Sequence, residues 1–356
     1  MTNKISEITF ADVMGSLDGK DDIDCSNKGL TSLAGCPEHV KGNFNCSGNQ
    51  LKTLEGAPKK IKGYFNCSNN QLTSLDDGPD EVKGDFDCSN NQLTSLHGSP
   101  MFIMGDFSCA GNLLTALNGE INDVSSESKA HAGCPQIVEG DFNCSGNKLT
   151  ILEGAPKIVG GDFNCSNNQL TSLNGSSKKA QGDFDCSNNQ LTSLHGCPMF
   201  IMGDFSCADN QLIFLVDGPQ EVYGNFDCSN NQLTSLKGNH KKVTGSFNCS
   251  VNQLTSLKGS PKEVESFDCS NNHLISLKKS PEKVKGNFNC SKNQLTSLKG
   301  APEKVKGDFD CSENQLIALE PPLKKVYGDF ICRDNAQLFR EEDVRLAYKI
   351  KGHYIL

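Results

Sequence analysis

The sequence predicts an α/β-type repeat solenoid of about fifteen repeats, with a curved parallel β-sheet on its concave face and a mostly irregular convex side. Fifteen cysteines recur along the chain, 21 residues apart except for one gap of 35 and one of 20. Each repeat contains a short alternating segment, Phe-x-Cys, which is typical of a strand, and it leaves no room for a full helix. Because such a repeat cannot bury its own apolar face, it must stack on its neighbours.

Residues 1–21 are expected to form an N-terminal cap, because the end of a solenoid otherwise exposes apolar surface. Residues 6–14 predict a short helix within this cap. Ile8, Val13 and Met14 are its expected contacts to the first repeat. The repeats themselves are expected to run from residue 22 to residue 338.

The repeat is clearest in residues 281–300, which read PEKVKGNFNCSKNQLTSLKG. Phe288 and Cys290 alternate with polar residues, so their side chains should share the inward face of a strand. Asn293, three residues after the cysteine, should turn the chain, and the leucines five and eight residues after the cysteine should point back inward. Asn occupies this turn position in fourteen of the fifteen repeats, and Lys28 replaces it in the first.

This pattern resembles the leucine-rich repeat, L-x-x-L-x-L-x-x-N-x-L, with Phe and Cys at the leucine positions of the strand. The stretch NNQLTSL is similar to the short 20-residue bacterial class of secreted effector proteins, and the repeat from Cys249 to Cys269 has that length. The 21-residue form is more loosely similar to leucine-rich-repeat proteins encoded by bacteriophages. The resemblance covers residues 22–338 and implies a leucine-rich-repeat fold. The Leu-Pro pairs of the effector class are mostly absent, and its ubiquitin-ligase domain has no counterpart in these residues.

The gap of 35 residues reflects an insertion at about residues 120–133, rich in Ser, Glu and Ala, which we expect to form an exposed loop. Two interpretations remain open. The insertion is either neutral or a loop that contacts a partner, since loops often carry function.

A duplication has shaped the chain. The stretch LTSLHGSPMFIMGDFSCAGNLL begins at Leu93, and LTSLHGCPMFIMGDFSCADNQL begins at Leu191, 98 residues later. This offset equals four 21-residue repeats plus the 14 inserted residues. A block of about five repeats was therefore copied, which a solenoid tolerates because each repeat touches only its neighbours.

Residues 339–356 are expected to form a C-terminal cap, because the repeat pattern fades after Asn335. Residues 339–348 predict a helix, and residues 353–356 predict a strand.

The eighteen cysteines admit three interpretations, as small buried apolar residues, as disulfides between neighbouring repeats, or as metal ligands. Parallel strands lie about 4.8 Å apart, which suits a disulfide, but side chains in register point the same way. One cysteine per repeat, in a line, cannot surround a tetrahedral ion. Buried reduced thiols are favoured. With no recognisable signal peptide, they predict a cytoplasmic protein of a bacterium or of a phage-infected host.

Two columns of side chains, three and one positions before each cysteine, contain no Lys or Arg and together hold fifteen Asp. Their formal charge of −15 exceeds the −9 of the whole chain, so negative charge gathers on one face. The resemblance implies that this face is the concave one. The residues expected to bind a partner are Asp85, Asp87, Asp106, Asp141, Asp162, Asp183, Asp185, Asp204, Asp227, Asp308 and Asp310.

The expected function is non-enzymatic protein–protein recognition, in which the acidic face binds a basic segment of a partner protein. The alternatives are a structural rod or spacer, such as a component of a phage particle, and a calcium-dependent or carbohydrate adhesin. A flat ladder offers carboxylates to calcium from one side only. The Asp columns also fit solvated strand edges without a function.

Several classes of protein are disfavoured. The net charge of −9 argues against nucleic acid as a partner. No apolar run approaches the roughly 20 residues that cross a membrane. No nucleophile has a recognisable base and orienting partner, and no phosphate-binding or dinucleotide-binding motif occurs. We therefore expect no catalytic residue, metal or cofactor, and the sequence leaves the oligomeric state open.

Overall fold

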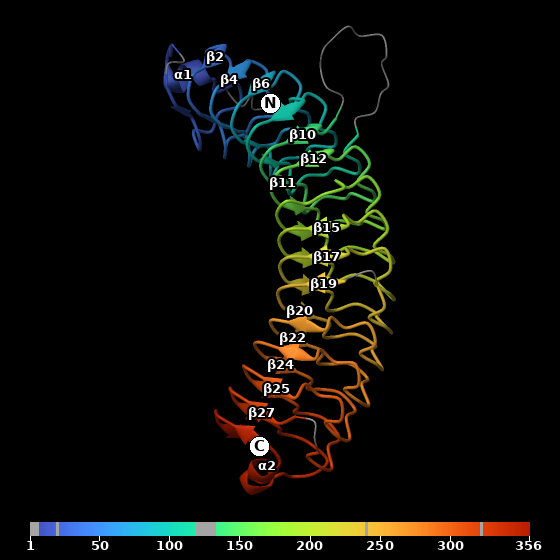
Figure 1. Cartoon of the computed structure of the whole chain (residues 1–356). Coiled ribbons are helices and arrows are strands. Elements are labelled where there is room, and N and C mark those ends of the chain that lie inside the picture. The colour runs from blue at the N-terminus through green and yellow to red at the C-terminus, as the bar shows by residue number, and fades with distance from the viewer. Residues whose placement is uncertain (1–6, 19–20, 119–132, 239–240, 321–322) are drawn as a thin grey trace, which may run out of the picture. The chain divides into compact units, whose positions relative to one another are not determined.

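The computed structural model describes residues 7–18, 21–118, 133–238, 241–320 and 323–356. It divides into an N-terminal unit, Met1–Gly182, and a C-terminal unit, Asp183–Leu356. In each unit the chain coils through successive repeats, and equivalent strands of neighbouring repeats lie side by side (Figure 1). Of the predicted loop at 120–133, residues 120–132 lie outside the described residues, and Gly133 is buried and pairs with Asn118.

Each repeat contributes a two-residue strand to a parallel sheet, which we call the Phe–Cys sheet because all of its strands except the first and the last start at Phe and are followed by Cys. Neighbouring strands pair in register, as Phe226 does with Phe247. In the N-terminal unit the strands are β1 (Ile23–Asp24), β3 (Phe44–Asn45), β5 (Phe65–Asn66), β7 (Phe86–Asp87), β9 (Phe107–Ser108), β11 (Phe142–Asn143) and β13 (Phe163–Asn164). In the C-terminal unit they are β14 (Phe184–Asp185), β16 (Phe205–Ser206), β18 (Phe226–Asp227), β20 (Phe247–Asn248), β22 (Phe267–Asp268), β24 (Phe288–Asn289), β26 (Phe309–Asp310), β28 (Phe330–Ile331) and β30 (Tyr354–Ile355).

The core lies behind this sheet and consists of stacked columns of identical residues. Neighbouring Phe rings lie close together, for example 4.9 Å between the centroids of Phe205 and Phe226. The leucines five and eight residues after each cysteine are also buried, as Leu233 and Leu236 show with no exposed surface. These inward positions confirm the prediction made from the alternation of the repeat.

The turn after each strand is held by the buried Asn three residues after the cysteine. Asn231 donates its side-chain N–H groups to the carbonyl oxygens of Cys207 and Cys228, at 3.0 and 3.3 Å. Its Oδ1 accepts the backbone N–H of Leu212 at 3.0 Å. One amide therefore satisfies backbone groups of two neighbouring repeats, which explains why a buried polar side chain is tolerated here.

The structure adds short parallel strands on the return side of most repeats, which we call the return strands. They form where an exposed or half-buried residue precedes a Val or Ile, which is buried in every return strand except the last, because this alternation suits a strand with one buried face. In the N-terminal unit they make two sheets, β2 (His39–Val40), β4 (Lys60–Ile61) and β6 (Glu81–Val82), and β8 (Phe102–Ile103), β10 (Ile137–Val138) and β12 (Ile158–Val159). In the C-terminal unit they make two more, β15 (Phe200–Ile201), β17 (Glu221–Val222) and β19 (Lys242–Val243), and β21 (Glu263–Val264), β23 (Lys283–Val284), β25 (Lys304–Val305), β27 (Lys325–Val326) and β29 (Lys349–Ile350).

The N-terminal helix α1 (Phe10–Met14) is shorter than the predicted one and makes a different contact. Phe10 is fully buried, and its ring lies 6.3 Å from that of Phe44, whereas Ile8 and Val13 are 36% and 40% exposed. Of the three expected contacts, Ile8 and Val13 are exposed and Met14 is half-buried, so the expectation was wrong for Ile8 and Val13. Phe10, which was not among them, extends the Phe column of the core. A capping box between Thr9 and Asp12 starts the helix.

At the C-terminal end, helix α2 (Glu341–Ala347) lies within the predicted helix. Tyr348 follows it and packs on Phe330, with 5.6 Å between the ring centroids. Strands β29 and β30 then pair with β27 and β28, so the last residues extend both kinds of sheet.

Candidate interaction surface

The first acidic column lies at the start of the Phe–Cys strands, and its side chains bond to the next repeat. Asp85 Oδ1 accepts the backbone N–H of Asp106 at 2.9 Å, and Asp106 Oδ1 accepts that of Asp141 at 2.8 Å. In the C-terminal unit, Asp204 Oδ1 accepts the N–H of Asn225 at 2.7 Å. Each side chain thus supplies a hydrogen-bond acceptor to a backbone N–H of the next repeat, at a position just before the two-residue strand.

The glycine before this column makes the contact possible. A Cβ atom at Gly105 would lie 2.1 Å from Asp85 Oδ1 and would collide with it. The absence of a side chain therefore lets the carboxylate reach the backbone of the next repeat.

The same bond forms without a negative charge where the column holds Asn or Ser. Asn43 Oδ1 accepts the N–H of Tyr64 at 3.0 Å, and Ser266 Oγ accepts that of Asn287 at 3.0 Å. The bond requires a short side chain with an acceptor oxygen and does not require a carboxylate. Tyr64 occupies the same column, so the fold does not depend on this bond in every repeat.

The second column bonds within its own repeat. Asp87 Oδ1 accepts the backbone N–H of Ser89 at 2.9 Å, and Asn164 Oδ1 accepts that of Ser166 at 3.0 Å. This contact, two residues ahead, is an Asx-turn, which Asp and Asn form equally well. These side chains also continue the outward face of the strand, where they are half-buried.

Two carboxylates at the ends of the columns have lowered pKa values. The side-chain and backbone hydrogen bonds from Ser26 lower the pKa of Asp24. The backbone N–H of His353, 2.7 Å from Asp329 Oδ1, lowers the pKa of Asp329. Hydrogen bonds to the charged form explain both directions.

The predicted binding residues follow one another in the sheet within each unit. In the N-terminal unit, the first column holds Asp in four successive repeats, and Asp87 of the second column lies beside them. In the C-terminal unit, further first-column and second-column residues lie on its own part of the sheet. The predicted residues of the second column are half-buried, as are Asp162 and Asp308 of the first column. The other predicted residues, all in the first column, are exposed. The members are Asp85, Asp87, Asp106, Asp141 and Asp162 in the first unit, and Asp183, Asp185, Asp204, Asp227, Asp308 and Asp310 in the second.

Sequence reasoning missed exposed apolar residues on the return strands. Met101, Phe102 and Met104 are 46%, 56% and 58% exposed, and Phe102 pairs in the sheet with Ile137. The duplicated copy, Met199, Phe200 and Met202, is exposed to a similar degree in the C-terminal unit. The available signal was that most other repeats place charged or polar residues at the corresponding positions.

The cysteines are reduced thiols, and burial makes those such as Cys228 poor nucleophiles. Cys228 is fully buried, and its thiol donates to the carbonyl oxygen of Asn248, with 3.3 Å between sulfur and oxygen. Burial raises the pKa of the Cys228 thiol well above its usual range. The column therefore acts as part of the core.

The contact between His97 and Asp76 does not make a catalytic site. His97 Nδ1 lies 2.5 Å from Asp76 Oδ1, and the Ser74 hydroxyl donates to the same carboxylate rather than to the imidazole. A hydroxyl nucleophile would need the imidazole as its base. Among the residues that the structure describes, no group of three His, Cys, Asp or Glu could hold a metal ion. None of the helices described is long and apolar enough to cross a membrane.

Comparison with solved structures identifies the architecture. The leucine-rich effector protein YopM from Yersinia pestis is 20% identical, with 92% of this chain and 88% of that chain covered and a TM-score of 0.57. The leucine-rich-repeat domain of APL1 is 15% identical, with 94% and 97% covered and a TM-score of 0.55. No family model matches the sequence, and no match is found among curated proteins. At these identities the likeness concerns the fold alone, and it confirms the predicted leucine-rich-repeat solenoid.

Proposed function

We propose that the protein performs non-enzymatic protein–protein recognition and that the acidic face of its Phe–Cys sheet binds a basic segment of a partner. One observation supports this most directly. Asn43 and Ser266 make the same backbone bond as the Asp residues of their column, so the charge has no required role in that bond. The accumulation of Asp in successive repeats then needs another explanation, and attraction of a cationic partner provides one.

The electrostatic argument points the same way. Equivalent residues of neighbouring repeats lie about 4.8 Å apart, the usual spacing of paired strands. Two carboxylates at such a distance repel each other by about 1 kcal/mol in water, before screening by salt. Lys and Arg side chains of a partner would relieve this repulsion, and the excess negative charge would steer the partner toward the sheet.

The test is the affinity of the full chain for a labelled lysine-rich peptide, measured by fluorescence anisotropy over a series of salt concentrations. In the first variant, Asp85→Asn, Asp106→Asn and Asp141→Asn remove three charges and keep the acceptor oxygens. In the matched control, Glu55→Gln, Glu139→Gln and Glu153→Gln remove three exposed charges outside the columns of the same unit.

We expect the first variant to bind about tenfold more weakly, with a flatter salt dependence, because each exposed charge contributes a fraction of a kcal/mol. The control should lose much less affinity. An equal loss in both variants would show that only net charge matters, and an unchanged affinity in both would refute binding at the acidic face.

A further inference from the structure

The repeat from Cys249 to Cys269 interrupts the return strands of the C-terminal unit. Two residues separate Val264 from Phe267, whereas three separate Val243 from Phe247. On the other side of the solenoid, β20 and β22 still pair in register. The missing residue therefore takes effect on the return side, where β19 and β21 belong to different sheets.

The break leaves two backbone N–H groups at the start of β21 without an acceptor among the described residues of the preceding repeat. In the intact repeats the pattern is regular: the N–H of Lys241 donates to Gln220 O at 2.7 Å, and the N–H of Glu282 donates to Lys262 O at 2.8 Å. At the break, the N–H groups of Lys262 and Glu263 have no acceptor among the residues that the structure describes. In an intact repeat the two equivalent N–H groups share one carbonyl oxygen, as those of Lys241 and Lys242 share Gln220 O at 2.7 and 3.3 Å, and just beyond the break the N–H of Glu265 still donates to Gly245 O at 2.9 Å. The start of β21 therefore offers a site for one further backbone carbonyl, which an extended segment of a partner can supply.

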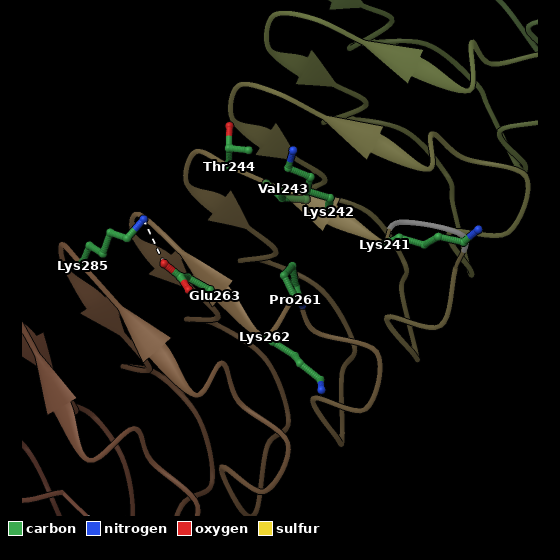
Figure 2. A pocket seen from close by; sticks show the side chains of 8 residues that line it. All are labelled: Lys241, Lys242, Val243, Thr244, Pro261, Lys262, Glu263 and Lys285. Atoms are coloured by element: carbon green, nitrogen blue, oxygen red, sulfur yellow. Dashed lines mark ion pairs between the residues drawn. The ribbon is translucent and has the colours of Figure 1, made fainter.

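A cleft of about 370 Å³ lies at this break. Figure 2 shows Lys242 and Val243 on one side of it and Pro261, Lys262 and Glu263 on the other. Its volume falls within the range of about 300–1,000 Å³ that small-ligand sites occupy. It is lined by side chains of only three successive repeats, all in the C-terminal unit.

The charge of the cleft is positive. Four lysines and one glutamate line it, and Lys285 and Lys283 pair with Glu263 at 3.0 and 3.2 Å. Lys241 Nζ bonds to an amide oxygen, that of Gln220, and Lys242 Nζ lies 4.2 Å from the centre of the Tyr223 ring. Lys241, Lys242 and Lys262 form no ion pair with any carboxylate of the described residues. Their charges remain available to an anionic ligand.

We propose that this cleft binds an acidic segment of a partner protein in extended conformation, which pairs with the free edge of β21 while its carboxylates contact the surrounding lysines. The chemistry of the site supports this choice of ligand. Its backbone N–H groups can bind a carbonyl oxygen of an extended segment, and its lysines attract acidic side chains. This interaction is independent of the acidic face, because it uses the return side and opposite charge.

The probe is a labelled peptide of alternating Glu and Val, added to the full chain. Its analogue with Gln in place of Glu serves as the comparison peptide. We expect saturable binding of the acidic peptide and at least tenfold weaker binding of the analogue. We also expect slower amide hydrogen exchange at residues 262 and 263 when the acidic peptide is bound, since a hydrogen-bonded amide exchanges more slowly.

Three variants locate the binding. Lys241→Gln with Lys262→Gln should weaken binding by about three- to tenfold, as expected for exposed charges. The matched control, Lys304→Gln with Lys325→Gln, removes the same charge from strands β25 and β27, an unbroken part of the sheet that contains β21, and should have little effect. Inserting a Gly between Glu265 and Ser266 restores a 21-residue repeat, so β19 and β21 should pair and peptide binding should be lost. The lysine variants keep the test decisive if the insertion does not fold.

Three results would overturn the proposal. The first is equal weakening by the cleft and control lysine variants. The second is unchanged binding to a folded insertion variant. The third is displacement of the peptide by inorganic phosphate with no change in exchange at residues 262 and 263, which would make the cleft a site for small anions.

Discussion

The Phe–Cys sheet and the return strands differ in how much their sequences vary. Along the Phe–Cys sheet, nearly every repeat supplies the same Phe, Cys and Asn, and strands pair in register through each unit. The return strands carry lysines, glutamates or exposed Met and Phe, and they separate into several sheets. A core of identical repeats stabilises the stack but makes each repeat alike, so the features that distinguish one repeat from another lie on the outside.

Alkaline pH should destabilise the core behind the Phe–Cys sheet and produce the largest effect. Burial raises the pKa of thiols such as Cys228 and Cys249 above that of an unfolded thiol, about 8.5. Because the folded pKa is raised, the stability is complete below about pH 8.5 and falls as pH rises toward the folded values. Each buried thiol then costs about 1.4 kcal/mol per pH unit, so several together exceed the stability of an ordinary domain.

This dependence can be measured by denaturant unfolding over a pH series from neutral to strongly alkaline. The double variant Cys228→Ala and Cys249→Ala should show a shallower fall, because two titrating thiols are removed. A free energy of unfolding that does not change above about pH 9 would mean that the cysteines are not buried as thiols.

Truncating an aromatic ring should separate the two sides clearly. Phe226 is buried between Phe205 and Phe247, with ring distances of 4.9 and 5.0 Å. Phe226→Ala should therefore lower the free energy of unfolding by about 3–5 kcal/mol. Phe200 is 43% exposed on a return strand, and Phe200→Ala should cost about 1 kcal/mol or less. Similar losses in both variants, measured by denaturant unfolding, would contradict the assignment of the core.

One position of the turn after the strand is strained and offers a smaller effect. The second residue after each cysteine has positive φ and is mostly Asn, Gly or Asp, but Val251 holds it at φ 54°. A left-handed conformation costs a β-branched residue roughly 1–2 kcal/mol. Val251→Asn should raise the free energy of unfolding by about 1 kcal/mol. The reverse change in the preceding repeat, Asn230→Val, should lower it by a similar amount. A loss of stability in Val251→Asn, or a gain in Asn230→Val, would contradict this explanation.

The sequence predicted the repeating parts of the fold, because each prediction was supported by many copies. Phe288, Cys290 and Asn293 illustrate a pattern whose alternation and turn leave little choice of structure. The contact of Phe10 was missed because the first turn occurs once, without copies to define its phase. The break between β19 and β21 was also missed, although the 20-residue gap was noticed. Sequence spacing locates a deletion but does not show in which sheet it interrupts the strand pairing.

The sequence predicted where the two Asp columns lie but not their hydrogen bonding. The columns were identified by counting from the cysteine, and their residues do lie on the sheet. The bond from Asp106 N–H to Asp85 Oδ1 could not be inferred, because it depends on how closely Gly105 lets two repeats approach. The side chain therefore has two separate properties: its acceptor oxygen, which the contact uses, and its charge, which the contact does not require.

The most direct test of this separation is the free energy of unfolding of two triple variants at Asp85, Asp106 and Asp141. Changing all three to Asn keeps the acceptors and should leave stability within about 0.5 kcal/mol of the parent, or raise it slightly as repulsion is relieved. Changing all three to Ala leaves backbone donors without partners and should cost about 1 kcal/mol for each bond lost. If the Asn variant lost as much as the Ala variant, the charge itself would hold the repeats together, and the account of a charge available for a partner would be contradicted.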